Sequence, residues 1–175
     1  MAFTVEDGTG VVGANSYVSV AYADEFFSDR GNSEWQGTDA VKQSLLIEAT
    51  DYIEMVYGRR FIGEMADTAQ ALSWPRSGTD DYLDSAYAAD EIPTVLKRAC
   101  CRYALQSLIS GPLAPTPVVD ETGLPVVTTR KAVGPIEKEF RLAGSSSRPA
   151  QFRSYPAADG LMASLLIPGS GQVIR

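Results

Sequence analysis

Apolar and polar residues recur with the period of an α-helix in two long segments of this chain. In the segment 92–111, apolar residues fall at the spacing of one helical face and widen to cover more than half of the circumference. Pro93 suits the first turn of a helix, and Gly111 followed by Pro112 ends it. A helix that is apolar over so much of its surface must be covered by several neighbours, so we expect it at the centre of the core. Its narrow polar face gathers Lys97, Arg98, Arg102 and Gln106.

The second long segment, 40–57, is the clearest amphipathic helix of the chain. Its apolar residues form one stripe, and most of its charged residues lie outside that stripe. Thr38 or Asp39 can cap its start through a side-chain oxygen, and Gly58 suits its end. Asn15 or Ser16 can cap a shorter helix that runs through Asp29.

The chain changes character after the central helix. Residues 112–125 form a proline-rich linker, and the segments 126–130 and 136–142 predict the two strands of a hairpin. Because two strands alone are marginal in water, this hairpin requires further contacts. A short apolar helix is expected over 157–166.

These elements predict a mainly α fold, a small helical bundle with a β-hairpin and an extended C-terminal arm. We expect a helical body with an extended N-terminal segment over residues 1–117, the hairpin over 118–143, and a docking arm over 144–175.

Charge is unevenly distributed along the chain, whose net charge is −7. Residues 1–119 carry 17 acidic and 8 basic residues, whereas residues 120–175 carry 5 acidic and 7 basic residues. An acidic body argues against binding nucleic acid by wide neutralisation of phosphates. The N-terminus has neither the basic region nor the apolar run of a signal peptide, and no stretch has the length of a membrane span. We therefore expect a protein without a membrane partner.

The residues that most enzymes need are scarce. The chain has no histidine, which removes the commonest general base and most zinc sites. Cys100 and Cys101 are adjacent on the central helix, and we expect both to be buried thiols. The string Gly8–Gly13 has the form GxGxxG, but no βαβ unit surrounds it. We expect no catalytic residue, no metal, no cofactor and no enzymatic activity.

Several aromatic, basic and apolar residues are candidates for contacts with partners. Trp74, beside Arg76, can either fill the core beneath a loop or anchor a subunit interface. Aromatic and basic residues alternate weakly over 138–155, in the style of single-strand binding, with Lys138, Phe140, Arg141, Phe152, Arg153 and Tyr155. The predicted partner-binding residues are Trp74, Arg76, Phe140, Phe152, Arg153, Tyr155, Leu161, Leu165 and Leu166.

Six segments, in this order and spacing, resemble one family of tailed-phage proteins. They read ANSYVSVAYADEFF (14–27), LLIEATDYIEMVYGRRFIG (45–63), QALSWPRSG (70–78), EIPTVLKRACCRYAL (91–105), KAVGPIEKEF (131–140) and YPAADGLMASLL (155–166). The chain is similar both to phage head–tail connector, or head-completion adaptor, proteins and to proteins labelled DnaT-like single-stranded DNA-binding.

The connector resemblance implies a structural virion protein at the head–tail interface, assembled in the host cytoplasm. It implies a ring of identical subunits, a dodecamer, between the portal protein and the tail or nozzle proteins. DNA would pass through the ring without specific binding, since an acidic channel repels phosphates. The alternative is a DnaT-like single-stranded DNA-binding protein. Because the net charge is negative, the sequence favours the connector.

Overall fold

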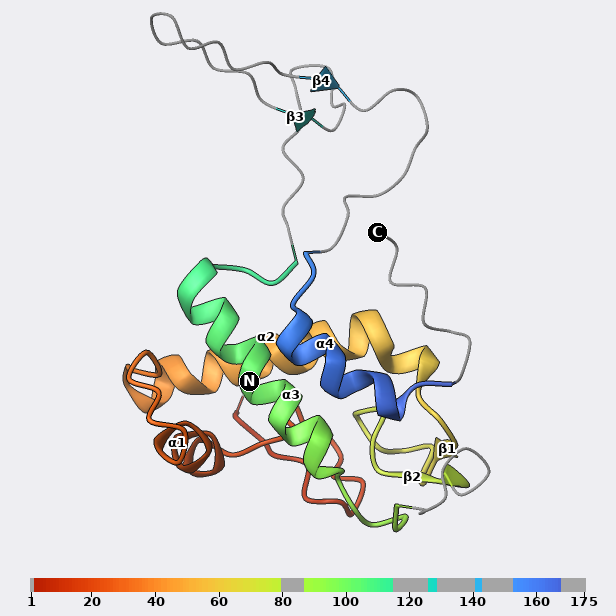
Figure 1. Cartoon of the computed structure of the whole chain (residues 1–175). Helices are drawn as coiled ribbons and strands as arrows, with labels where there is room; N and C mark the ends of the chain where they lie inside the picture. The colour runs from red at the N-terminus through yellow and green to blue at the C-terminus, as the bar shows by residue number, and fades with distance from the viewer. Residues whose placement is uncertain (1, 80–86, 115–125, 129–140, 143–152, 168–175) are drawn as a thin grey trace, which may run out of the picture. The chain divides into compact units, whose positions relative to one another are not determined.

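The structure is a computed structural model that describes residues 2–79, 87–114, 126–128, 141–142 and 153–167 (Figure 1). Within these residues the chain is mainly helical with a small antiparallel hairpin, which confirms the predicted fold class. The elements are α1 (Val20–Ser28), α2 (Asp39–Tyr57), the 3₁₀ turn η1 (Gly58–Arg60), β1 (Glu64–Met65), β2 (Arg76–Ser77), α3 (Thr94–Ser110), β3 (Val126–Thr128), β4 (Arg141–Leu142), α4 (Pro156–Met162) and the 3₁₀ turn η3 (Ala163–Leu165).

Helix α3 is the centre of the core, as its wide apolar face predicts. Both α2 and α4 pack against it, and α1 contacts both α2 and α3 (Figure 1). Leu96, Ala99, Cys100 and Tyr103 on α3 are completely buried. Burial of a large apolar side chain such as Leu96 contributes about 1.5–3 kcal/mol, so the buried face of this helix stabilises the fold.

Side-chain caps set where the first two helices begin. The Thr38 hydroxyl accepts a backbone N–H in the first turn of α2, as predicted. Helix α1 begins later than the sequence predicts, because Ser19 and not Asn15 or Ser16 is its cap. Ser16 instead forms a parallel bridge with Val5. The residues before Ser19 are therefore held extended against the N-terminal segment.

Two short antiparallel strand pairs complete the described elements. β3 pairs with β4, with Val126 opposite Leu142, as the predicted hairpin requires. Residues 129–140, which include the rest of the predicted strands, lie outside the described residues. β1 pairs with β2 and was not predicted, because two residues per strand are too few to produce a periodic pattern.

The chain forms two compact units. One combines Met1–Leu113 with Ser154–Arg175, and the other is Ala114–Arg153. The described part of the segment predicted as a docking arm therefore lies largely with the helical body, where α4 packs on α3. The predicted boundaries at 117 and 143 stay predictions. No helix in the described part of the chain combines the length and the apolar character needed to cross a membrane.

Candidate nucleic-acid interface

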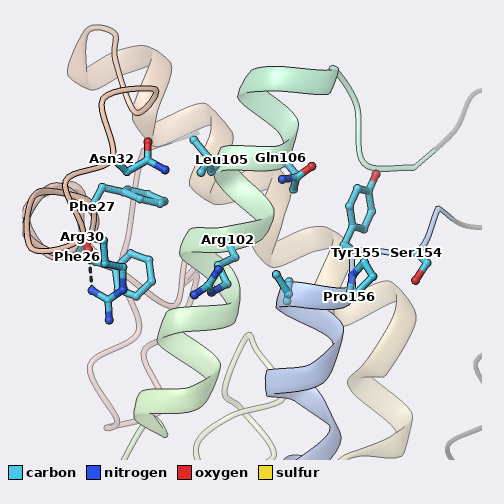
Figure 2. Close-up of a pocket in the computed structure, with 12 residues that line it drawn as sticks. Phe26, Phe27, Arg30, Asn32, Arg102, Leu105, Gln106, Ser154, Tyr155 and Pro156 are labelled. Carbon is cyan, nitrogen blue, oxygen red and sulfur yellow. Dashed lines mark hydrogen bonds between the residues drawn. The ribbon is translucent and has the colours of Figure 1, made fainter.

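A pocket of about 480 Å³ lies where α1, α3 and the start of α4 approach one another (Figure 2). This volume is in the range of about 300–1,000 Å³ that small-ligand sites occupy. Its lining includes Phe26, Phe27, Arg30, Arg102, Gln106 and Tyr155. None of its lining residues is acidic, although the chain as a whole is. The pocket therefore combines aromatic walls with positive charge.

Two aromatic side chains of α1, Phe26 and Phe27, form one wall. Phe26 and Phe27 are buried with their rings nearly perpendicular, and Phe27 also packs on Trp35 at 4.9 Å between ring centroids. The Arg30 guanidinium carbon lies 3.7 Å from the centroid of the Phe26 ring. Arg30 Nη1 also donates a hydrogen bond to the Phe26 carbonyl oxygen at 2.7 Å. These two contacts hold the Arg30 side chain against the aromatic wall.

The α3 wall contributes Arg102 and Gln106, which are one helical turn apart and so share a face of the helix. The Nε atom of Arg102 is buried and makes no hydrogen bond with any described residue. Burying a charged donor without an acceptor is costly. An anionic ligand oxygen in the pocket would reduce that cost.

The third wall is fixed by Tyr155, directly before α4. Its ring makes perpendicular contacts with Tyr52 and Tyr103, each at 5.8 Å between centroids. Its hydroxyl donates to the Leu113 carbonyl oxygen at 3.1 Å, and its backbone N–H donates to Asp159 at 2.8 Å. Tyr155 is therefore held by contacts at both ends.

Asp159 holds α4 in place through phenol hydroxyls of the other helices. The hydroxyls of Tyr103 and Tyr57 donate to its Oδ1 atom at 2.6 Å and 3.1 Å. Burial, together with the hydrogen bond to Asp159, raises the pKa of Tyr103 well above its usual range. Burial also raises the pKa of Tyr57 to about 12. Both phenols are therefore neutral donors at physiological pH, and the Asp159 carboxylate is engaged by them.

Two of the predicted partner-binding residues, Trp74 and Arg76, lie in the interior of the body. Trp74 is completely buried and packs edge-on against Phe61. Arg76 is buried and donates to the carbonyl oxygens of Ile62 at 2.6 Å, Gly63 at 2.6 Å and Ser73 at 3.0 Å. These positions agree with one of the two alternatives given above, that Trp74 fills the core beneath a loop.

The remaining predicted residues have several different environments. Tyr155 lines the pocket, and Arg153 is exposed just before it in the chain. Leu165 is buried, whereas Leu161 and Leu166 are partly buried against the core. Phe140 and Phe152 lie outside the described residues.

The pocket also contains residues that the sequence analysis did not select as a site, namely Phe26, Phe27, Arg30, Arg102 and Gln106. The polar face of the central helix carried a signal for two of them, Arg102 and Gln106. No pattern linked that face to Arg30 or Tyr155, which are far away in sequence.

The glycine-rich string near the N-terminus folds around a carboxylate of its own chain. The buried Glu6 side chain accepts the backbone N–H groups of Gly8, Gly10 and Val11 at 2.8–3.0 Å. Gly8 has φ 109°, and a Cβ atom there would lie 2.0 Å from the Asp90 carbonyl oxygen. The donors that a phosphate would need are thus engaged by Glu6. Among the described residues, no group of His, Cys, Asp or Glu side chains could hold a metal ion.

The model of a known family matches residues 1–175 of the chain. The matching family is described as "Putative DnaT-like ssDNA binding protein". No curated protein and no solved structure matches the chain.

The prediction of a head–tail connector is wrong on this finding, as are the virion, portal-binding and ring-forming properties attached to it. The features that favoured it were an acidic surface and a linker-rich C-terminal part. Neither is specific, because acidic surfaces mostly serve solubility. Over its whole length the chain belongs to the DnaT-like family, which the sequence analysis had kept as the alternative.

Proposed function

We propose that this protein binds single-stranded DNA, and that it acts by binding rather than by catalysis. The observation that carries the proposal is membership of the DnaT-like family over residues 1–175. The sequence itself contains no histidine, the residue on which general acid–base catalysis most often depends.

The types of side chain that line the pocket also support the proposal. Proteins that bind single strands without sequence preference combine basic groups for the backbone with aromatic or guanidinium planes on which bases stack. Arg30 on Phe26 offers such a plane, and Arg102 offers a charged donor. Both lie in a pocket without an acidic lining residue.

The net charge of −7 sets an expectation for the mode of binding. A protein of this charge gains little from wide neutralisation of phosphates, so the contacts with the backbone must be few and local. If two arginines each neutralise one phosphate, log K should fall with log salt with a slope of about −1.4. Stacking of bases then supplies most of the affinity.

The experiment is a titration of a fluorescently labelled oligothymidylate of about 16 nucleotides, long enough for most site sizes of single-strand-binding folds. Anisotropy is measured between about 50 and 200 mM salt, the range in which phosphate contacts weaken strongly. We expect saturable binding with the shallow slope given above. An unlabelled duplex of the same length should compete poorly, because its bases are not free to stack.

Two results would overturn the proposal. One is no change in anisotropy at the lowest salt concentration and the highest protein concentration. The other is equal competition by duplex and single strand, which would indicate a general attraction to phosphates.

A further inference from the structure

The pocket selects for ligands that carry both a negative charge and an apolar or aromatic plane. Its charged lining residues are Arg30 and Arg102, and its aromatic ones are Phe26, Phe27 and Tyr155. The nearby Asp159 carboxylate is engaged by its own donors, Tyr103 among them. A cation therefore gains little from entering the pocket, whereas an anion gains an attraction to both arginines.

Arg102 is the strongest single indication of a ligand. Its guanidinium makes no hydrogen bond or ion pair with any of the residues 2–79, 87–114 and 153–167, and its Nε atom is buried. Trp74 Nε1 is buried without a partner as well, but it lies in the core and does not line the pocket. The planar guanidinium can give two parallel hydrogen bonds to one phosphate. Arg102 lines a pocket of about 480 Å³, in which such an acceptor fits beside its guanidinium group.

Arg30 is prepared for a different contact. Its guanidinium carbon lies over the Phe26 ring at 3.7 Å from the ring centroid, and the side chain as a whole is exposed. The hydrogen bond to the Phe26 carbonyl oxygen fixes this arrangement before any ligand arrives. A nucleobase stacks favourably on a guanidinium plane. A surface fixed in advance loses less conformational entropy on binding.

Gln106 adds a group that can contact the edge of a base without selecting one base. Its side-chain amide has no hydrogen-bond partner among the described residues, and it lines the pocket one turn from Arg102. An amide donates and accepts, so it can pair with different base edges.

We propose that this pocket holds one nucleotide of the single strand, with its phosphate at Arg102 and its base against the Arg30–Phe26 pair. The proposal rests on the proposed function, and it places that function at α1, α3 and Tyr155. The volume of about 480 Å³ suits a single nucleotide, so neighbouring nucleotides bind outside the pocket.

The test compares the wild type with Arg102→Gln, Arg30→Ala and Arg59→Gln in the titration with oligothymidylate. Arg59 is exposed on η1 and does not line the pocket, so Arg59→Gln matches the loss of charge without touching the site. We expect Arg102→Gln to weaken binding about tenfold and to make the salt slope less negative by about 0.7. Arg30→Ala should weaken binding about fivefold or more through lost stacking. Arg59→Gln should bind as the wild type does.

A second measurement observes the pocket directly. In ¹⁵N–¹H spectra of the full chain, deoxythymidine monophosphate should shift the Nε–H signal of Arg102 and compete with the oligonucleotide. Deoxythymidine without phosphate and inorganic phosphate should each do so more weakly, because each supplies half of the contacts. Thermal unfolding of every variant checks that the fold is retained.

The outcomes separate the two proposals. A wild type that does not bind the oligonucleotide overturns the proposed function and this inference with it. A wild type that binds, with Arg102→Gln and Arg30→Ala equal to Arg59→Gln, overturns the pocket alone and leaves the proposed function standing. Inorganic phosphate that shifts the Arg102 signal as strongly as the nucleotide does, without competing with the oligonucleotide, also overturns the pocket.

Discussion

Arg76 and Arg102 have the same side chain in two regions of the molecule, and the two side chains differ in their hydrogen bonds. Arg76 is 9% exposed and gives hydrogen bonds to three backbone carbonyl oxygens. Arg102 lines a pocket and has no such bond among the described residues. The first arginine joins the segments before β1 and β2 through these carbonyl oxygens, whereas the second joins no part of the described chain by a hydrogen bond. The two arginines therefore differ in whether their donors are satisfied and in whether they line the pocket.

The largest effect should follow from removing the structural arginine. Arg76→Met leaves three carbonyl oxygens without their donor, and we expect the free energy of unfolding to fall by about 3–5 kcal/mol. Urea denaturation followed by circular dichroism measures this loss. Arg59→Met, on the surface, is the control and should change the free energy of unfolding by less than about 0.5 kcal/mol. Equal losses of unfolding free energy in both variants would contradict a special structural role for the buried arginine.

Alkaline pH should weaken the tyrosine- and cysteine-rich core. Burial raises the pKa of Cys100 and of Tyr57 to about 12 each, from ordinary values of 9.0 and 10.0. The folded state thus favours the protonated groups, so their contribution is complete below about pH 9 and is lost as the pH rises toward 12. The loss should reach about 1.4 kcal/mol per pH unit for each group once its unfolded form is ionised.

Denaturation at a series of pH values between 7 and 11 measures this decline. The double variant Cys100→Ala, Cys101→Ala removes the thiols and should move the onset of the decline upward, from about pH 9 to about pH 10. Stability that stays constant up to pH 11 in the wild type would contradict the assigned burial of these groups.

A smaller effect is expected where α4 is attached to the body. Asp159→Asn replaces an acceptor of several donors by an amide, and we expect a loss of about 1–2 kcal/mol. The same variant should weaken oligonucleotide binding, because Asp159 positions Tyr155 at the pocket. Tyr57→Phe is the control, since it removes one of these hydrogen bonds and leaves the carboxylate in place. A variant that is destabilised but binds normally would show that Tyr155 is not needed in the site.

The smallest effect on stability should come from the ligand-binding arginine. Arg102→Met removes an unpaired, partly buried charge, and we expect the free energy of unfolding to stay the same or to rise by up to about 1 kcal/mol. Thermal and urea unfolding without DNA measure it. A loss of about 2 kcal/mol or more would mean that Arg102 is structural, as Arg76 is.

The sequence predicted the parts of this molecule that depend on neighbours along the chain. The central helix, the cap at Thr38 and the paired β3 and β4 strands all follow from local patterns of apolar residues and caps. The start of α1 did not, because Ser16 is drawn into a bridge with Val5 that only the folded chain reveals.

The candidate site could be predicted only in fragments. The polar face of α3 was visible, and Tyr155 was selected as a possible contact. These residues come close to Arg30 only because three segments from distant parts of the sequence pack together. The net charge predicted against DNA binding. A charge summed over the whole chain does not reveal that the pocket has no acidic lining residue.

The way the pocket is assembled has a consequence for its local unfolding. Its α3 wall and its α4 wall are separated in the chain by the unit Ala114–Arg153. Joining them closes a long loop, and the entropy cost of closure grows with loop length, by about 0.6 kcal/mol for each doubling. The chain must lose this entropy before the contacts form, and it regains the entropy when α4 separates from α3, which favours local opening at this contact. A nucleotide that contacts both walls would make that opening less frequent. Amide hydrogen exchange in α4 would therefore slow down when the pocket is occupied.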